Sequence, residues 1–326
     1  MPNISTPLVR ILVGLTVLFT ALSSAHGDSG EYVFILKGRG NVFWKVLRDG
    51  IQDTASSLGI PAVILNTDDD QTPEAQLNIC LTSITRKPRM IVLGAATKNV
   101  GIECFKKASA AGIKIADVDG NVSVEQARQV GIELAFSVTS DNVAIGRRAA
   151  EHLATLTQAD APKVLVIRGL PGSIVSEQRA RGFLDRLKEL RPAARIVGTP
   201  TSDWDRMKAM NITLDFTQRE ADLDFIFSVS DFMTTGVVEA LKIAKKNQSC
   251  RILSVDGMAD ARKAILDGGI AADVAQLPYL MGKRAVELAR EASERTLVGV
   301  TEHTATPLLT KEILERADDP ELAYLK

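Results

Sequence analysis

The chain has 326 residues, with 39 basic and 40 acidic side chains and an aromatic content of 5%. A nearly neutral chain offers no excess of positive charge to bind nucleic acid or an anionic membrane surface, so neither partner is expected. The length is sufficient for one large or two medium-sized domains.

The N-terminus has the pattern of a secretory signal peptide. Arg10 precedes an apolar run over residues 11–22, and small residues at 23–25 come before His26. A basic residue, a short apolar run and a small-residue cleavage site together mark exported proteins. We therefore expect residues 1–26 to be removed, the mature chain to begin near His26, and the protein to lie in the periplasm.

The apolar run is too short to cross a bilayer comfortably, which favours a cleaved signal peptide. An uncleaved membrane anchor is the alternative. No later stretch of the sequence is as apolar. We therefore expect no stable membrane insertion after signal cleavage.

From residue 32 onward, strand-like and helix-like segments alternate. Expected strands lie at residues 32–36, 62–65, 90–93, 113–116, 132–138, 164–167, 195–197, 225–227, 252–255, 272–275 and 303–309. Expected helices lie at residues 43–58, from 72 onward, 99–110, 141–156, 176–190, 204–219, 231–245, 259–267 and 278–295. This alternation predicts an α/β fold of parallel sheets with helices on both faces. So many strands favour two doubly wound parallel-sheet lobes over one open sheet.

The first expected strand is followed by a segment that resembles a binding loop. The strand ends before Gly38-Arg39-Gly40, and a helix begins at Asn41 with Phe43 and Trp44 in its first turn. Ligands of open α/β sheets bind at the carboxyl ends of the strands. Aromatic faces beside polar groups suit a sugar, which has C–H faces and hydroxyl edges. The alternative is a core aromatic pair behind an ordinary loop.

Polar and aromatic side chains recur wherever an expected strand ends. An aspartate at such a place can simply cap a helix, and Asp141, Asp205 and Asp231 are the residues most open to that interpretation. Taken together, carboxylates that accept from paired hydroxyls, a guanidinium, amides and aromatic rings favour a monosaccharide or a sugar alcohol as ligand. The polar residues at the strand ends are Lys37, Asn41, Asp117, Asp119, Ser140, Asp141, Arg179, Trp204, Asp231, Asp256 and Gln276.

Five segments together resemble the type I periplasmic sugar-binding proteins of the ribose/allose group, which serve ABC transporters. They are residues 37–44, 139–146, 203–208, 255–257 and 274–278, and the resemblance extends from about residue 32 to about residue 309. The matched positions imply ligand contacts by Lys37, Asn41, Phe43, Asp119, Arg179, Trp204, Asp256 and Gln276. Trp44, at a position that is aromatic across the group, and Ser140 and Asp231 complete the candidate ligand-binding set.

The sequence departs from the ribose-binding pattern at several of these places. Ser230 stands where the family often has Asn, and Gly120 stands where ribose binders have Arg. The missing amide and guanidinium contacts would leave hydroxyl groups of ribose unpaired. We therefore expect a different sugar or a sugar alcohol.

The resemblance also implies a three-segment hinge between the lobes. The crossings are expected near residues 138–141, 276–278 and 302–305. The N-terminal lobe would comprise residues 31–139 plus 277–303, and the C-terminal lobe residues 140–276 plus 304–326. Hinge closure would bury the ligand between the lobes for delivery to an ABC transporter permease. A ligand-sensing partner of a membrane sensor kinase or chemoreceptor is the alternative role.

No enzymatic site is expected, and no cofactor or metal is implied. Gly38-Arg39-Gly40 hints at a dinucleotide-binding loop, but Phe43 occupies the position of the third glycine, so the fingerprint fails. The sequence has no His-Glu-x-x-His motif, and its three histidines are scattered.

Export permits a disulfide, and the topology suggests which cysteines form it. Cys80 and Cys104 lie in the expected helices after the second and third strands, which a doubly wound fold places on one face of the sheet. We predict a disulfide between them. Cys250 is expected to be an unpaired, partly exposed thiol.

Overall fold

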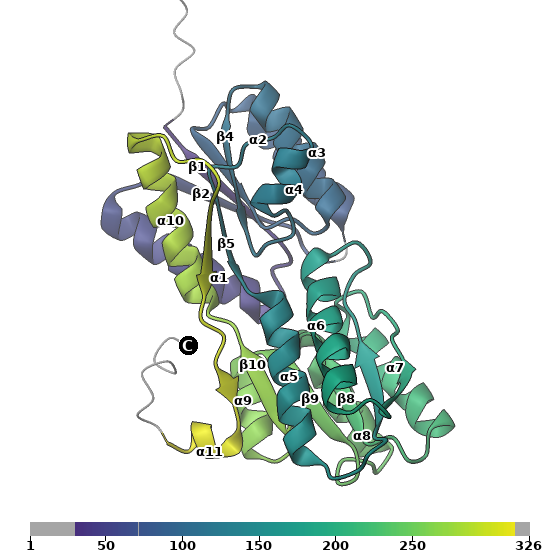
Figure 1. Ribbon diagram of the computed structural model, residues 1–326. Coiled ribbons are helices and arrows are strands. Elements are labelled where there is room, and N and C mark those ends of the chain that lie inside the picture. Colours follow the sequence, from purple (N-terminus) through teal and green to yellow (C-terminus); the bar gives the residue numbers. More distant parts are fainter. Residues whose placement is uncertain (1–29, 71, 317–326) are drawn as a thin grey trace, which may run out of the picture.

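The computed structural model describes residues 30–70 and 72–316 as two α/β lobes, each built on a six-stranded sheet (Figure 1). The predicted signal peptide lies outside the described residues. The first sheet has the strand order β11-β5-β4-β3-β1-β2, and all its neighbouring strands are parallel. Its strands are β1 (Tyr32–Leu36), β2 (Ala62–Asn66), β3 (Met90–Leu93), β4 (Lys114–Val118), β5 (Phe136–Ser140) and β11 (Val300–Thr304).

The second sheet repeats this arrangement in the order β12-β10-β9-β8-β6-β7, with only β12 antiparallel to its neighbour. Its strands are β6 (Lys163–Ile167), β7 (Arg195–Gly198), β8 (Phe225–Ser228), β9 (Arg251–Asp256), β10 (Ala272–Ala275) and β12 (Leu308–Leu309). In both sheets the chain order reverses beside the first strand of the lobe, which is the position where ligands bind in doubly wound folds.

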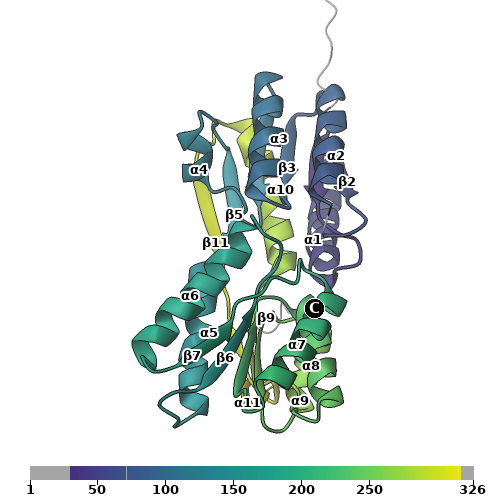
Figure 2. The ribbon, with the colours of Figure 1, turned by 90° about the vertical axis from the view of Figure 1, so that its right-hand side faces the viewer.

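The helices that connect the strands pack on the faces of the sheets (Figures 1 and 2). They are α1 (Val42–Leu58), α2 (Pro73–Thr85), α3 (Lys98–Ala110), α4 (Val124–Gln129), α5 (Asn142–Leu156), α6 (Ile174–Leu190), α7 (Arg206–Arg219), α8 (Asp231–Ile243), α9 (Ala259–Leu266), α10 (Pro278–Glu294) and α11 (Lys311–Leu314).

The strand β1 shows why its apolar run is continuous rather than alternating. Phe34 and Leu36 belong to one hydrophobic cluster, whereas Val33 and Ile35 belong to the cluster on the opposite face of the sheet. Successive side chains of a strand point to opposite faces, so a strand covered on both sides must be apolar throughout.

The chain passes between the lobes in three places. After β5 it enters the second lobe through α5, and after β10 it returns, because α10 packs on α1 and β11 pairs with β5. After β11 it crosses again, because β12 pairs with β10. These passages place three connections side by side at the junction of the lobes; the exact lobe boundaries stay a prediction.

The prediction of one strand over residues 303–309 is wrong. Two strands occupy this stretch, β11 in the first sheet and β12 in the second. Pro307 lies between them and has no N–H to donate to a sheet ladder, although its carbonyl oxygen accepts from Ala275 N at 2.8 Å.

The prediction of a strand over residues 132–138 placed its start too early. Ile132 N donates to Ala127 O at 3.0 Å and ends a turn, so β5 begins only at Phe136. The short helix α4 precedes this turn and was not predicted. It carries a capping box, in which Ser123 and Gln126 each bond to the backbone of the other.

The predicted disulfide between Cys80 and Cys104 is confirmed, and it joins α2 to α3. Cys250 is unpaired as predicted, but it is buried rather than partly exposed. None of the helices in the described part of the chain is long and apolar enough to cross a membrane.

Candidate functional site

A cavity, with about 330 Å³ of empty space when its opening to solvent is included, lies where the carboxyl ends of the two sheets face each other. All predicted site residues except Ser140 and Asp231 line it. The complete lining is Lys37, Asn41, Phe43, Trp44, Asp70, Asp119, Val175, Arg179, Trp204, Ser230, Asp256 and Gln276.

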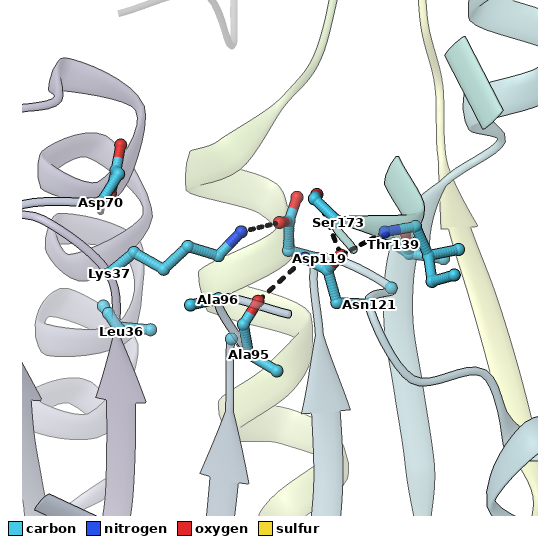
Figure 3. A network of polar contacts seen from close by, with 12 residues as sticks. Leu36, Lys37, Asp70, Ala95, Ala96, Asp119, Asn121, Thr139 and Ser173 are labelled. Carbon is cyan, nitrogen blue, oxygen red and sulfur yellow. Dashed lines mark hydrogen bonds and ion pairs between the residues drawn. The ribbon is translucent and has the colours of Figure 1, made fainter. Parts of the chain in front are cut away.

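A buried ion pair forms the wall of the cavity on the first lobe. Figure 3 shows Lys37 extending from the end of β1 to Asp119, which follows β4, and the Nζ–Oδ2 distance is 2.9 Å. Lys37 Nζ also lies 4.6 Å from the ring centroid of Trp44. Both charged side chains are 4% exposed, so the pair is screened little by solvent. Lys37 has further N–H groups with which to donate to a ligand.

The N-terminus of α1 brings Asn41 and two aromatic rings to the same wall. Asn41 caps the helix, because its Oδ1 accepts from Phe43 N at 3.0 Å. Phe43 and Trp44 meet edge to face, with ring centroids 4.9 Å apart. Both rings are buried and both line the cavity, so they are not only a core pair, as the alternative interpretation held.

Asp256, at the end of β9, organises the wall on the second lobe. Its carboxylate accepts from Arg179 Nη1 at 3.2 Å, from Gln276 Nε2 at 2.7 Å and from Ser230 Oγ at 2.9 Å. Burial raises the pKa of Asp256 above its ordinary value, while Arg179 and these hydrogen bonds oppose the rise. Arg179 is held in turn by the side chain of Asn142 and the carbonyl oxygen of Val229, both at 2.8 Å.

Trp204 closes the cavity from the loop before α7, not from within a helix as the predicted range 204–219 implied. Asp203 and Trp204 both have positive φ, and α7 begins only after Asp205 caps it by accepting from Lys208 N. The indole ring lies against the backbone of Gly169, where a Cβ atom would overlap the ring. The loop therefore fixes the direction of the ring.

Backbone strain is concentrated at this site. Asp119, Trp204 and Asp256 have φ values of 79°, 59° and 118°, a region that non-glycine residues rarely adopt. All three line the cavity. Such conformations persist only where the surroundings fix them, and they gather at binding and catalytic sites.

Two buried polar atoms of the cavity wall lack a hydrogen-bond partner within the described residues. They are Trp204 Nε1, which is a donor, and Gln276 Oε1, which is an acceptor. Leaving such groups unpaired is unfavourable by about 1–3 kcal/mol each. A ligand that accepts from one and donates to the other would satisfy both.

Ser140 and Asp231 were predicted for the site, but they do not line the cavity. Ser140 Oγ lies 3.3 Å from Thr304 Oγ1, at the crossing between the lobes. The carboxylate of Asp231 turns away from the cavity to accept from Ser254 Oγ and from Met258 N. Its neighbour Ser230 supplies the side chain that faces the cavity.

Asp231 instead forms a buried carboxyl pair with Asp273 on β10. Both side chains are almost completely buried, and the two carboxyl groups are close enough to influence each other electrostatically. Burial and the neighbouring carboxyl group hold the pKa of Asp231 well above its ordinary value. Burial, as the largest cause, raises the pKa of Asp273 to about 6.

Sequence reasoning missed Asp70, Val175 and Ser230. Asp70 was assigned only to a polar loop after the second strand, yet it is buried and lines the cavity. Its position just after a strand end was the available signal. Asp141 and Asp205 are helix caps, as the simpler interpretation of these residues held.

The described residues contain no cluster of three or more side chains suited to binding a metal. The groups gathered in the cavity are hydrogen-bond donors, hydrogen-bond acceptors and aromatic rings. They can bind a small polar molecule on all sides.

Two lobes joined by three chain segments, with a polar cavity between the carboxyl ends of their sheets, define a bilobal solute-binding protein. Residues 32–295 match the family model for the periplasmic binding protein domain. The chain belongs to this family.

Curated relatives cover almost the whole chain. The D-allose-binding periplasmic protein of Escherichia coli is 28% identical over 284 residues, which are 87% of this chain and 89% of that protein. The D-apiose import binding protein of Paraburkholderia graminis is 26% identical and covers 95% of each chain. A solved ABC transporter solute-binding protein from Agrobacterium vitis with bound D-fucose has a TM-score of 0.83 at 24% identity, over 91% of this chain and 99% of that one, and supports the same fold.

Proposed function

We propose that this protein captures a monosaccharide or a sugar alcohol in the interlobe cavity and delivers it to the permease of an ABC importer. The main observation behind this proposal is a pair of buried atoms in the cavity wall, Trp204 Nε1 and Gln276 Oε1, which have no hydrogen-bond partner among the described residues. One atom donates and the other accepts, and a hydroxyl group can do both. The relatives named for allose and apiose support the same ligand class.

The cavity provides each kind of contact that a sugar needs. Asp119 and Asp256 can accept from hydroxyl groups, whereas Lys37 and Arg179 can donate to hydroxyl and ring oxygens. The rings of Phe43, Trp44 and Trp204 supply apolar faces for C–H groups. We infer that the ligand contacts are the predicted site residues that line the cavity.

Capture would proceed by rotation of the lobes about the three crossings near residues 138–141, 276–278 and 302–305. The N-terminal lobe would comprise residues 31–139 plus 277–303, and the C-terminal lobe residues 140–276 plus 304–326. Ligand contacts made from both lobes at once favour the closed state. We assign no catalytic step to the site, and we propose that the protein acts in the periplasm after signal cleavage.

The direct test is a thermal-shift and calorimetric screen of D-allose, D-ribose, D-apiose, D-fucose and a set of sugar alcohols. A binding sugar raises the free energy of unfolding by RT ln(1 + [L]/Kd), about 2.7 kcal/mol at a hundredfold excess over Kd. Asp256→Asn should weaken binding at least tenfold, because the side chain loses the charge that pairs with Arg179, and its NH2 group must face donors that a carboxylate oxygen accepts from in the wild type.

The matched control is Asp267→Asn, an exposed substitution in the same lobe whose only described ion pair is with Lys263. It should leave sugar affinity unchanged. Stabilisation by none of the sugars or polyols, or equal affinity of wild type and Asp256→Asn, would refute the proposal. Sugar-dependent stimulation of the ATPase of a co-reconstituted permease would establish delivery rather than sensing.

A further inference from the structure

Asp70 is a buried carboxylate in the cavity wall that sequence comparison with sugar binders did not single out. It follows β2, and its Oδ1 accepts from Gly38 N at 2.7 Å while its Oδ2 accepts from Asn41 Nδ2 at 2.8 Å. The residue is 7% exposed. Figure 3 shows it beside the start of the Lys37 side chain.

Asp70 differs from the other carboxylates of the cavity in its partners. Asp119 lies 2.9 Å from a lysine nitrogen, and Asp256 lies 3.2 Å from an arginine nitrogen. The hydrogen bonds described for Asp70 come from two neutral N–H groups. A buried carboxylate held by neutral donors makes strong, short hydrogen bonds that fix the donors.

Asn41 is held at both ends of its amide. Its Oδ1 accepts from Phe43 N, and its Nδ2 donates one hydrogen to Asp70. The surroundings thereby decide the orientation of the amide, since a flip would place an N–H against Phe43 N–H and an oxygen against a carboxylate. The second hydrogen of Nδ2 is the group that Asn41 has left for a ligand.

We propose that Asp70 is a positioning residue of the binding site, which orients the amide of Asn41 so that it donates to an oxygen atom of the sugar. This inference rests on the proposed function. Asp70 acts through Asn41 and not by touching the sugar. The recognised group is therefore an acceptor, either a hydroxyl or a ring oxygen.

The chemistry explains why an aspartate is needed at this position. Two donors, Gly38 N and Asn41 Nδ2, converge on the side chain, and a carboxylate offers an acceptor oxygen to each. In Asp70→Asn the side chain has a single oxygen, so its NH2 group must face one of the two donors. The variant keeps the shape of the side chain and removes its ability to hold both groups.

The test is a double-mutant cycle on affinity for whichever of D-allose, D-ribose or D-apiose binds wild type most tightly. Asn41→Ser removes the amide but keeps a good helix cap. We expect Asp70→Asn to weaken binding about tenfold in the wild-type background. In the Asn41→Ser background the same substitution should change affinity less than twofold.

The opposing outcomes of the cycle are distinct. An equal loss in both backgrounds would mean that Asp70 contacts the sugar itself, which overturns the positioning role. Unchanged affinity together with a lower Tm would mean that Asp70 only holds the loop, which overturns it as well.

A ligand-free measurement separates this inference from the proposed function. In protein labelled with 15N-asparagine, the side-chain amide signal of Asn41 is assigned by its loss in Asn41→Ser. We expect slow exchange of its amide hydrogens with solvent in wild type and at least tenfold faster exchange in Asp70→Asn. Equal exchange rates would refute the positioning role even if no sugar bound.

Discussion

At the scale of single residues, Trp204 makes two separable contributions to the cavity. Its ring packs on Gly169, and its Nε1 is buried without a partner among the described residues. Trp204→Phe keeps an aromatic six-membered ring and removes the five-membered part of the indole with its N–H group. We expect sugar affinity to fall about fivefold to tenfold, since a donor to the ligand is lost.

The same substitution should lower the Tm of the ligand-free protein only slightly, because removal of a polar group whose burial is unfavourable offsets part of the packing lost with the smaller ring. The measurements are calorimetric titration with the best-binding sugar and thermal unfolding without it. Full affinity in Trp204→Phe would show that no ligand oxygen accepts from the indole, and would remove this atom from the site.

The buried pair of Asp231 and Asp273 predicts how stability depends on pH. In the unfolded chain an aspartate has a pKa of about 3.9, whereas the pKa of Asp273 in the folded protein is about 6. The folded state therefore holds an extra proton between these values, and its stability falls as pH rises from about 4 to about 6. Asp256 and Arg262 face the same pair and modulate it with opposite charges.

Asp273→Asn should remove much of this loss. The amide can donate a hydrogen bond to Asp231 without taking up a proton, so the difference in stability between pH 4.5 and pH 7.5 should shrink by about 2 kcal/mol. Urea unfolding of both proteins at the two pH values measures the difference. An identical pH dependence in the variant would mean that the Asp273 carboxyl group does not titrate in this range.

The sequence placed most cavity residues correctly for a simple physical reason. The carboxyl ends of parallel strands meet at one edge, so polar residues just after buried strands must lie near one another. The sequence did not show which of several neighbouring polar residues faces the cavity. Ser230 faces the cavity while Asp231 points toward β9 and β10, and of the acidic residues 68–70 only Asp70 is a cavity-lining residue. Side-chain direction after a strand depends on the local φ and ψ, which composition does not reveal.

At the scale of secondary-structure elements, glycines set how closely paired helices approach. In α5 and α6, a Cβ atom at Gly146 would overlap the carbonyl oxygen of Arg179, and one at Gly182 would overlap that of Val143. In α1 and α10, Gly282 lies in the same way against the carbonyl oxygen of Leu47. Both helix pairs therefore pack backbone against backbone.

The two helix pairs differ in whether the tightly packed turn holds a cavity residue, and this difference allows a matched comparison. Gly146→Ala must displace the turn of α6 that holds Arg179, whereas Gly282→Ala displaces helices that the cavity uses only at the first turn of α1. We expect each to lower the free energy of unfolding by about 1–3 kcal/mol. Only Gly146→Ala should also weaken sugar binding, by about tenfold, as calorimetry would measure. Equal affinity in the two variants would contradict this division.

Some features were predictable because a general rule of the fold decided them. The disulfide followed from topology, since the helices after β2 and β3 lie on one face of the sheet. Other elements depended on partners distant in the sequence. Residues 303–309 divide between the end of β11 and the short strand β12 because β5 and β10, with which these strands pair, lie in different lobes. Tertiary pairing, and not propensity, decided that stretch.

At the scale of the whole molecule, the two lobes touch directly beside the cavity. Asn121 follows β4 in the first lobe and lies beside Ser173 of the second lobe (Figure 3), and its Oδ1 accepts from Ser173 Oγ at 3.1 Å. The same oxygen of Asn121 accepts from Ile174 N at 2.8 Å. Its Nδ2 donates to Ala95 O at 2.8 Å, which fixes the amide. A nearby backbone bond from Lys98 N to Gly172 O also joins the lobes. The observed arrangement of the lobes thus has stabilising contacts that need no ligand.

Asn121→Ala should therefore speed the release of a bound sugar by shifting the equilibrium of the lobes toward the open form. The variant loses both interlobe contacts of one amide and leaves Ile174 N, at the first turn of α6, without its acceptor, so we expect release about tenfold faster. Ser173→Ala loses only one of the contacts and should have a smaller effect. Stopped-flow release measures the rate, and small-angle X-ray scattering should give the ligand-free variant a larger radius of gyration. An unchanged release rate would mean that the sugar alone holds the lobes together.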